Sequence, residues 1–118
     1  MSTAVSWLLR ATINNGANDD FRSLMDEMIE SARDEPGTTN YEWFIDDSES
    51  SFHVYERYAD SDAAMTHIGN FDAKFAERFL SLVEVSEMTV YGAPSDEVRQ
   101  ALAGLGSNFY GNLGGFSR

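Results

Sequence analysis

Alternating and helical spacings of apolar residues divide the first ninety or so residues into strands and helices. An apolar stretch rich in β-branched residues over positions 4–13 predicts the first strand, and the turn signal Asn14-Asn15-Gly16 follows it. The next segment predicts the clearest helix, with one apolar stripe: Phe21, Leu24, Met25, Met28, Ile29 and Ala32. We expect Asn18 to cap this helix and Pro36-Gly37 to end it.

Three more strands are predicted from apolar and aromatic residues that alternate with polar ones. They cover positions 39–45, 51–58 and 83–91. The polar run at 46–50 between the first two is typical of a hairpin turn. These two strands and their turn therefore predict an antiparallel pair.

Two short helices are predicted between residue 58 and the last of these strands. Asp60 or Ser61 is expected to cap the first, which runs to Ile68, and Gly69-Asn70 is expected to break it. The second carries an apolar set: Phe71, Phe75, Phe79 and Leu82. The resulting order, β-α-β-β-α-α-β, predicts an α+β, ferredoxin-like antiparallel sheet with helices on one face only.

Residues 94–118 are an addition to this plan. Pro94-Ser95 opens a predicted short helix, and residues 106–118 are rich in Gly and Asn but still contain aromatic side chains. We therefore divide the chain into a ferredoxin-like domain over 1–93 and a C-terminal helix with a Gly-rich tail over 94–118.

The predicted sheet has apolar or aromatic residues on both faces. Trp43 and Phe44 point in opposite directions, as do Val54 and Tyr55. Helices on one face would leave the other exposed, and soluble monomers rarely expose large apolar patches. We therefore expect a homodimer in which two sheets pack face to face and the C-terminal helix and tail pack on the partner subunit. Alternatively, the C-terminal helix and tail fold back over the open face of their own chain.

Composition narrows the classes of function. The net charge of −12 argues against binding to nucleic acid or to an anionic membrane surface. No stretch approaches the ~18 apolar residues of a membrane span, and the start of the chain is too quickly polar for a signal peptide, so we expect a cytoplasmic protein. With no cysteine, two histidines and no metal-binding spacing, we expect no metal ion.

Several short motifs occur in a fixed order along the chain. They are Glu35-Pro36-Gly37, Tyr41-Glu42-Trp43, Val54-Tyr55-Glu56-Arg57-Tyr58, Asp60-Ser61-Asp62-Ala63-Ala64, and His67 followed by Phe71 and Phe75. This ordered set resembles the antibiotic-biosynthesis-monooxygenase-like proteins, which are dimeric α/β barrels, over about Val5 to Tyr91. The resemblance implies, for some members, oxidation of aromatic polyketides or quinols by molecular oxygen without metal or flavin. One branch of the family degrades haem, but the histidine that it uses has no counterpart in residues 71–83, so we expect no cofactor.

His67 is the candidate catalytic residue, because it stands on the helix where the family commonly has a histidine. A neutral imidazole near pH 7 can take a proton from a phenol-type hydroxyl. The alternative is a structural histidine that bonds a strand carbonyl or Glu56 and holds the helix to the sheet. Glu56 itself, if buried, needs a partner, for which Arg57, Arg10 and His67 are candidates.

Aromatic and imidazole side chains on two strands and one helix are candidates for substrate binding: Trp43, Tyr41, Tyr55, His53 and Phe75. Aromatic rings with polar tips suit a flat aromatic ligand, because they combine stacking with a hydrogen bond. The alternative is that these residues pack in the core or in the dimer interface.

Two functions of different class remain open from the sequence. The first is a cofactor-independent monooxygenase that acts on a small aromatic, quinol or polyketide-like substrate. The second is a non-enzymatic homodimer of the same fold that binds a small apolar molecule or another protein.

Overall fold

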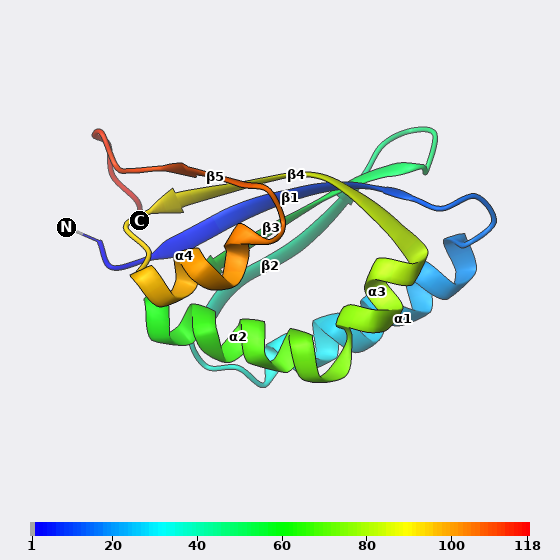
Figure 1. Cartoon of the computed structure of the whole chain (residues 1–118), viewed down its shortest axis with the longest axis horizontal. Helices are drawn as coiled ribbons and strands as arrows, with labels where there is room; N and C mark the ends of the chain where they lie inside the picture. Colours follow the sequence, from blue (N-terminus) through cyan, green and yellow to red (C-terminus); the bar gives the residue numbers. More distant parts are fainter. Residues whose placement is uncertain (1) are drawn as a thin grey trace.

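A five-stranded sheet with four helices on one of its faces makes up the molecule, whose computed structural model describes residues 2–118 (Figure 1). The strands lie in the order β2-β3-β1-β4-β5. The elements along the chain are β1 (Val5–Ile13), α1 (Asn18–Arg33), β2 (Thr38–Ile45), β3 (Ser51–Tyr58), α2 (Ser61–Lys74), α3 (Ala76–Leu82), β4 (Val83–Gly92), α4 (Asp96–Ala103) and β5 (Ser107–Tyr110).

The predicted ferredoxin-like α+β plan is confirmed, with one strand added. β1 lies at the centre and pairs antiparallel with β3 and β4, and β2 pairs antiparallel with β3. The sequence did not predict β5, which pairs in parallel with β4 and aligns Phe109 with Val90. Because β5 is four residues long and lies in a Gly- and Asn-rich segment, its alternation is too short to be read as a strand.

Two local predictions about helix ends were wrong. α2 does not break at Gly69-Asn70 but continues to Lys74, and the side-chain amide of Asn70 donates a hydrogen bond of 2.9 Å to Glu35. Gly69 lies on the exposed side of this helix, where a glycine weakens a helix without ending it. Asn18 does not cap α1, since its side-chain amide instead donates to the backbone carbonyl of Glu49.

The core lies between the sheet and the helices. Alternate residues of β1 and β3 point toward the helices and are buried: Val5, Trp7, Leu9, Ala11, Ile13, Phe52, Val54, Glu56 and Tyr58. The predicted stripe of α1 packs on them through Phe21, Leu24 and Met28. Burial of each large apolar side chain contributes about 1.5–3 kcal/mol, so this layer accounts for much of the stability.

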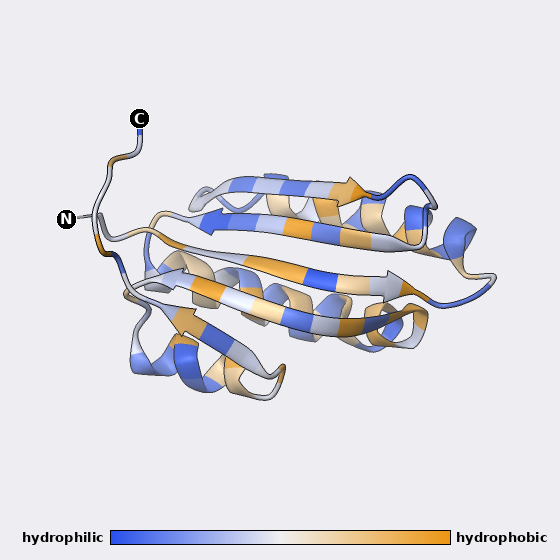
Figure 2. Ribbon diagram, turned by 90° about the horizontal axis from the view of Figure 1, so that it is seen from above, coloured by the Kyte–Doolittle hydropathy of each residue, from blue (hydrophilic) through white to orange (hydrophobic). Residues whose placement is uncertain are grey.

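The opposite face of the sheet carries no helix and mixes aromatic with charged residues. Seen from above, apolar and polar residues alternate along the strands (Figure 2). Phe44, Tyr91 and Tyr110 are exposed, while Arg10 and Glu87 form an ion pair of 3.4 Å on neighbouring strands. We call this surface the open face.

The C-terminal helix packs on its own chain. Val98 and Leu102 of α4 are buried in the core, and the backbone N–H of Ser95, which caps α4, donates to the side chain of Ser61 at the start of α2. Farther along, Arg57 of β3 donates a hydrogen bond of 3.1 Å to the side chain of Ser117. Packing of the tail on a partner subunit stays a prediction.

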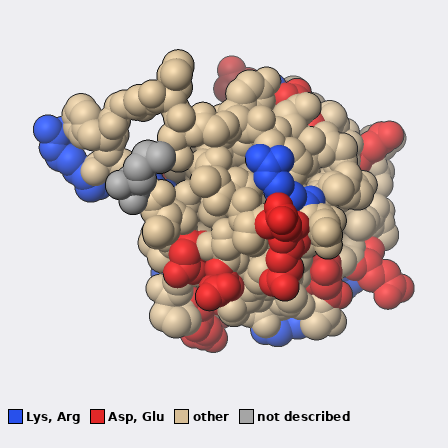
Figure 3. Space-filling model, turned by 60° about the vertical axis from the view of Figure 1, so that its left-hand side comes forward, with Lys and Arg blue, Asp and Glu red and all other residues tan. Residues whose placement is uncertain are grey.

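Acidic side chains form several separate groups on the side of the molecule shown in Figure 3, with few basic ones between them. This distribution matches the net charge of −12. Within residues 2–118, no helix is both long enough and apolar enough to pass through a bilayer. The cytoplasmic location expected from the sequence stays a prediction.

Candidate functional site

A cavity of about 280 Å³ lies between the sheet and the helix layer. Its walls are mainly apolar, and they come from both layers: Trp7, Val54 and Met88 from the sheet, and Ile68, Phe71 and Phe79 from the helices. Cavities of this kind, with a few polar groups among apolar walls, are typical of sites for small molecules. The volume lies near the lower end of the range for such sites, which suits a small ligand.

Glu56, Tyr41 and His67 supply the polar groups at the buried end of the cavity. Glu56 is on the inner face of β3, and Tyr41 stands directly opposite it on β2. His67 is on the inward side of α2, where its ring meets that of Tyr41 edge to face. Helix and strand periodicities thus bring together three polar side chains that are far apart in the sequence.

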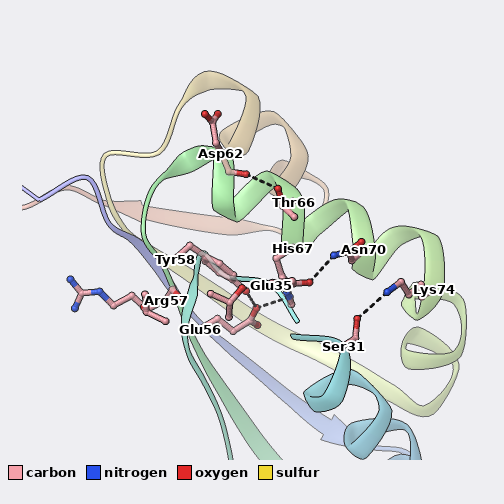
Figure 4. Close-up of polar contacts among 12 residues, drawn as sticks. Ser31, Glu35, Glu56, Arg57, Tyr58, Asp62, Thr66, His67, Asn70 and Lys74 are labelled. Atoms are coloured by element: carbon pink, nitrogen blue, oxygen red, sulfur yellow. Dashed lines mark hydrogen bonds and ion pairs between the residues drawn. The ribbon is translucent and has the colours of Figure 1, made fainter. Parts of the chain in front are cut away.

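A hydrogen-bonded cluster holds His67 between two carboxylates (Figure 4). Its Nδ1 lies 2.8 Å from Oε1 of Glu35, and its Nε2 lies 3.2 Å from Oε1 of Glu56. Glu35 is on the segment between α1 and β2, so the cluster ties this segment to α2 and β3. All three side chains are almost fully buried.

Neutral donors add further hydrogen bonds to the two carboxylates. Thr38 donates to Oε1 of Glu35 at 2.7 Å, and Asn70 donates to its Oε2 at 2.9 Å. The hydroxyl of Tyr58 donates to Oε1 of Glu56 at 2.5 Å. Among residues 2–118, no group donates a hydrogen bond to Oε2 of Glu56, so this oxygen keeps its capacity to accept one.

The electrostatics of the cluster favour a protonated histidine. Burial alone would lower the pKa of His67, but its hydrogen bonds to Glu35 and Glu56, together with their negative charges, raise it from 6.5 to about 9. Burial would raise the pKa of Glu35, but hydrogen bonds from His67, Asn70 and Thr38 hold it below its ordinary value. At neutral pH, His67 is therefore an imidazolium whose two N–H groups both point at carboxylates.

Burial also keeps the neighbouring phenols neutral. It raises the pKa of Tyr41 and of Tyr58 well above 10, and the negative charges of Glu56 and Glu35 add to the effect. Both hydroxyls therefore stay protonated and remain hydrogen-bond donors. That of Tyr58 is used within the cluster, whereas that of Tyr41 donates to no acceptor within residues 2–118.

Three of the six predicted site residues line the cavity: His67, Trp43 and Tyr41. The structure does not bring the other three to it. His53 and Tyr55 alternate with Val54 on β3, so they lie on the open face. Phe75 is buried where α2 meets α3 but is not part of the cavity wall.

Trp43 has a polar atom without a partner. Its indole Nε1 is enclosed and makes no hydrogen bond of good geometry among residues 2–118, although the hydroxyl of Tyr41 lies beside it. The ring packs parallel to Phe52, at 5.8 Å between centroids, and edge to face with Tyr41 and Phe79. An enclosed N–H without an acceptor is costly and is rare in folded proteins.

Sequence reasoning missed several members of the site. The sequence places Glu35 and Tyr58 only within motifs and predicts only a helix break at Asn70, whereas all three bond to the cluster in the structure. The one indication of the cluster in the sequence is Glu56, because a carboxylate buried on a strand needs a partner. The structure shows that this partner is His67 rather than Arg57 or Arg10.

The arrangement does not resemble a metal centre. Within the described residues, no three His, Asp or Glu side chains are placed to hold a metal ion together. Glu35 and Glu56 bond to opposite nitrogens of the His67 ring, so the three side chains do not converge on one point. The cluster is instead a chain of hydrogen bonds.

Solved structures with the same fold include proteins from several bacteria. MupZ from Pseudomonas fluorescens has a TM-score of 0.88 at 23% identity, over 100% of this chain and 91% of that protein. SnoaB from Streptomyces nogalater, described as a cofactor-independent oxygenase, has a TM-score of 0.67 at 19% identity, over 80% of this chain and 96% of that protein. Rv0793 from Mycobacterium tuberculosis has a TM-score of 0.60 at 28% identity, over 79% of this chain and 96% of that protein.

A comparison with curated protein sequences finds no significant match. The family model described as antibiotic biosynthesis monooxygenase matches residues 5–77, which span β1 to the start of α3 and include every member of the hydrogen-bonded cluster. On this match, which covers more than half of the sequence, the chain belongs to the antibiotic biosynthesis monooxygenase family.

Proposed function

We propose that the protein is a cofactor-independent monooxygenase that oxidises a small aromatic, quinol or polyketide-like substrate with molecular oxygen. The observation that carries the proposal is an apolar cavity whose buried end holds a carboxylate, an imidazolium and a phenol hydroxyl. Membership of the family and the description of SnoaB as a cofactor-independent oxygenase support it. No metal or flavin is needed if the substrate anion itself reduces oxygen.

In this proposal the protein prepares the substrate for reaction with oxygen. The apolar walls remove water from an electron-rich ring, and an acidic hydroxyl of the substrate donates its proton to the free Oε2 of Glu56. The anion of an anthrone-type substrate then reduces O₂, so that its CH₂ group becomes C=O with release of one water. One oxygen atom enters the product and the other leaves as water.

His67 acts in this scheme as an orienting and charge-balancing group. Its Nε2–H fixes Oε1 of Glu56, and its positive charge lies next to the place where the substrate becomes negative. Tyr58 holds the same oxygen from the other side. Tyr41 has a hydroxyl free to donate a hydrogen bond to the substrate, which gives the anion a second point of contact.

Oxygen uptake with a panel of quinols and anthrones tests the proposal. We expect uptake above buffer with the natural protein and a loss of about 100-fold or more in His67→Gln, which removes the positive charge. His53→Gln is the matched control, because His53 lies on the open face and should leave uptake unchanged. Uptake no faster than buffer with the natural protein across the panel would contradict the enzyme proposal.

One observation favours the second function, a binding protein without enzymatic activity. Both ring nitrogens of His67 are already bonded to carboxylates, so the site offers no neutral imidazole to act as a base. A binding protein predicts that quinols occupy the cavity without consumption of oxygen. Quenching of tryptophan fluorescence by a bound quinol, measured beside oxygen uptake, separates the two functions.

We also propose that two copies of the chain pair through the open face, since proteins of this family are typically dimeric. Phe44, Tyr91 and Tyr110 are exposed there, and pairing would remove their apolar surface from water. Sedimentation should show a dimer that Phe44→Glu dissociates. Leu80→Glu is the control, because Leu80 is about as exposed as Phe44 but lies on α3. A monomer at micromolar concentration would contradict the pairing.

A further inference from the structure

The cavity has a mouth bordered by the end of α2, by α3 and by α4 with the turn after it. Four of its lining residues are exposed to solvent and mark this rim: Asp72, Leu80, Ala101 and Gly104. The polar lining residues Glu56 and His67, in contrast, are buried. The cavity thus leads from a solvent-exposed rim to a buried region that carries a carboxylate and an imidazolium.

The wall formed by α4 belongs to the part of the chain that follows the matched family region of residues 5–77. α4 and the turn after it contribute Ala101, Leu102, Gly104 and Leu105 to the cavity. The helix is fixed in place, because Leu102 is buried in the core and the backbone at Ser95 is bonded to α2. The position of this wall is therefore set by the fold.

The rim residues contributed by α4 and its turn are small where the backbone would accept larger ones. Gly104 adopts φ −67° and ψ −12°, a conformation open to any residue, and a Cβ built there meets no heavy atom within 4 Å. Neither backbone strain nor close packing therefore requires glycine at this position. Ala101, one turn earlier, is also exposed at the rim and presents only a methyl group.

We propose that Ala101 and Gly104 determine ligand size, because they leave the mouth open for the apolar end of a flat, elongated phenol-type molecule. The hydroxyl of this ligand lies toward Glu56, and its far rings pass between α3 and α4. The inference rests on the proposed function only in that the substrate occupies this cavity. A larger side chain at either position shortens the space and excludes long ligands while short ones still bind.

Intrinsic tryptophan fluorescence can test the dependence of binding on ligand length, because both tryptophans of the chain, Trp7 and Trp43, line the cavity. The probes are 4-nitrophenol, with one ring, and hydroxyanthraquinone, with three fused rings. We expect Ala101→Leu and Gly104→Leu each to weaken hydroxyanthraquinone binding by about tenfold or more, because the added side chain overlaps the third ring. Binding of 4-nitrophenol should change by less than about twofold.

Ala103→Leu is the matched control, since Ala103 is exposed on the same helix but does not line the cavity. It should bind both probes as the natural protein does. The proposal is overturned if both leucine variants bind hydroxyanthraquinone normally, if they lose both probes equally, or if neither probe binds the natural protein. Oxygen uptake is measured separately. Binding with the expected size dependence but without oxygen uptake would contradict the monooxygenase proposal, while the proposal that Ala101 and Gly104 determine ligand size would still hold.

Discussion

The two faces of the sheet place alternate side chains of the same strands in different environments. On β3, Glu56 and Tyr58 point toward the helices and join a buried hydrogen-bonded cluster. One position away, Tyr55 and Arg57 point to the open face. Because side chains alternate along a strand, a shift of one residue separates an environment that changes a pKa from one that faces solvent.

This contrast shows where polar residues can carry chemistry in so small a domain. Polar groups on the inner face are removed from water, so each needs a partner and each partner has a large effect. Those on the open face keep contact with water in the single chain, and their interactions are screened. Substitutions on the two faces should therefore change the free energy of unfolding by different amounts, and these changes should depend differently on protein concentration.

The largest difference is expected between the only two histidines. His67→Ala leaves Glu35 and Glu56 buried without their shared cation, and we expect it to lower the free energy of unfolding by about 3–5 kcal/mol. His53→Ala, on the open face, should lower it by less than about 0.5 kcal/mol. Urea denaturation at a fixed protein concentration measures both. Equal losses at the two positions would remove the distinction between the faces.

The dependence of stability on pH should come from the inner face. The pKa of His67 is about 9 in the folded chain and 6.5 when unperturbed, so its stabilisation is complete below pH 6.5 and is lost as the pH rises through 9. The pKa difference corresponds to about 3 kcal/mol. Urea titrations of the natural protein and of His67→Gln at pH 6.5 and pH 9 isolate the contribution of His67. A variant that loses as much stability as the natural protein would show that other groups are responsible.

The sequence predicted the sheet and its helices because hydrophobic periodicity reports which side of each element is buried. The same alternation separates Glu56 from Arg57, and it placed Tyr41 and Trp43 correctly on one face. It does not say which face of β3 meets the helices, so His53 and Tyr55 were grouped with the site. Glu35 escaped prediction because it lies between two elements, where no periodicity indicates the direction of a side chain.

A smaller difference in the free energy of unfolding is expected between substitutions of two tyrosines of β3. Tyr58→Phe removes the hydroxyl that donates to Glu56, and the buried carboxylate loses a donor at a cost of about 1.5–3 kcal/mol. Tyr55→Phe, on the open face, should change the free energy of unfolding by less than about 0.5 kcal/mol. Thermal and urea unfolding give the two values. If Tyr58→Phe proved as mild as Tyr55→Phe, the bond to Glu56 would not contribute to stability.

The smallest effect is expected for the ion pair between Arg10 and Glu87 on the open face. Its atoms are 3.4 Å apart and both side chains are more than 40% exposed, so Arg10→Met should cost about 0–1 kcal/mol, and less at high salt. The measurement is urea unfolding at low and high salt, repeated over a hundredfold range of protein concentration. Dimerisation through this face would bury the pair, so the cost would then grow with protein concentration. A cost that stays small at every concentration would show that solvent, and not a second chain, covers this part of the sheet.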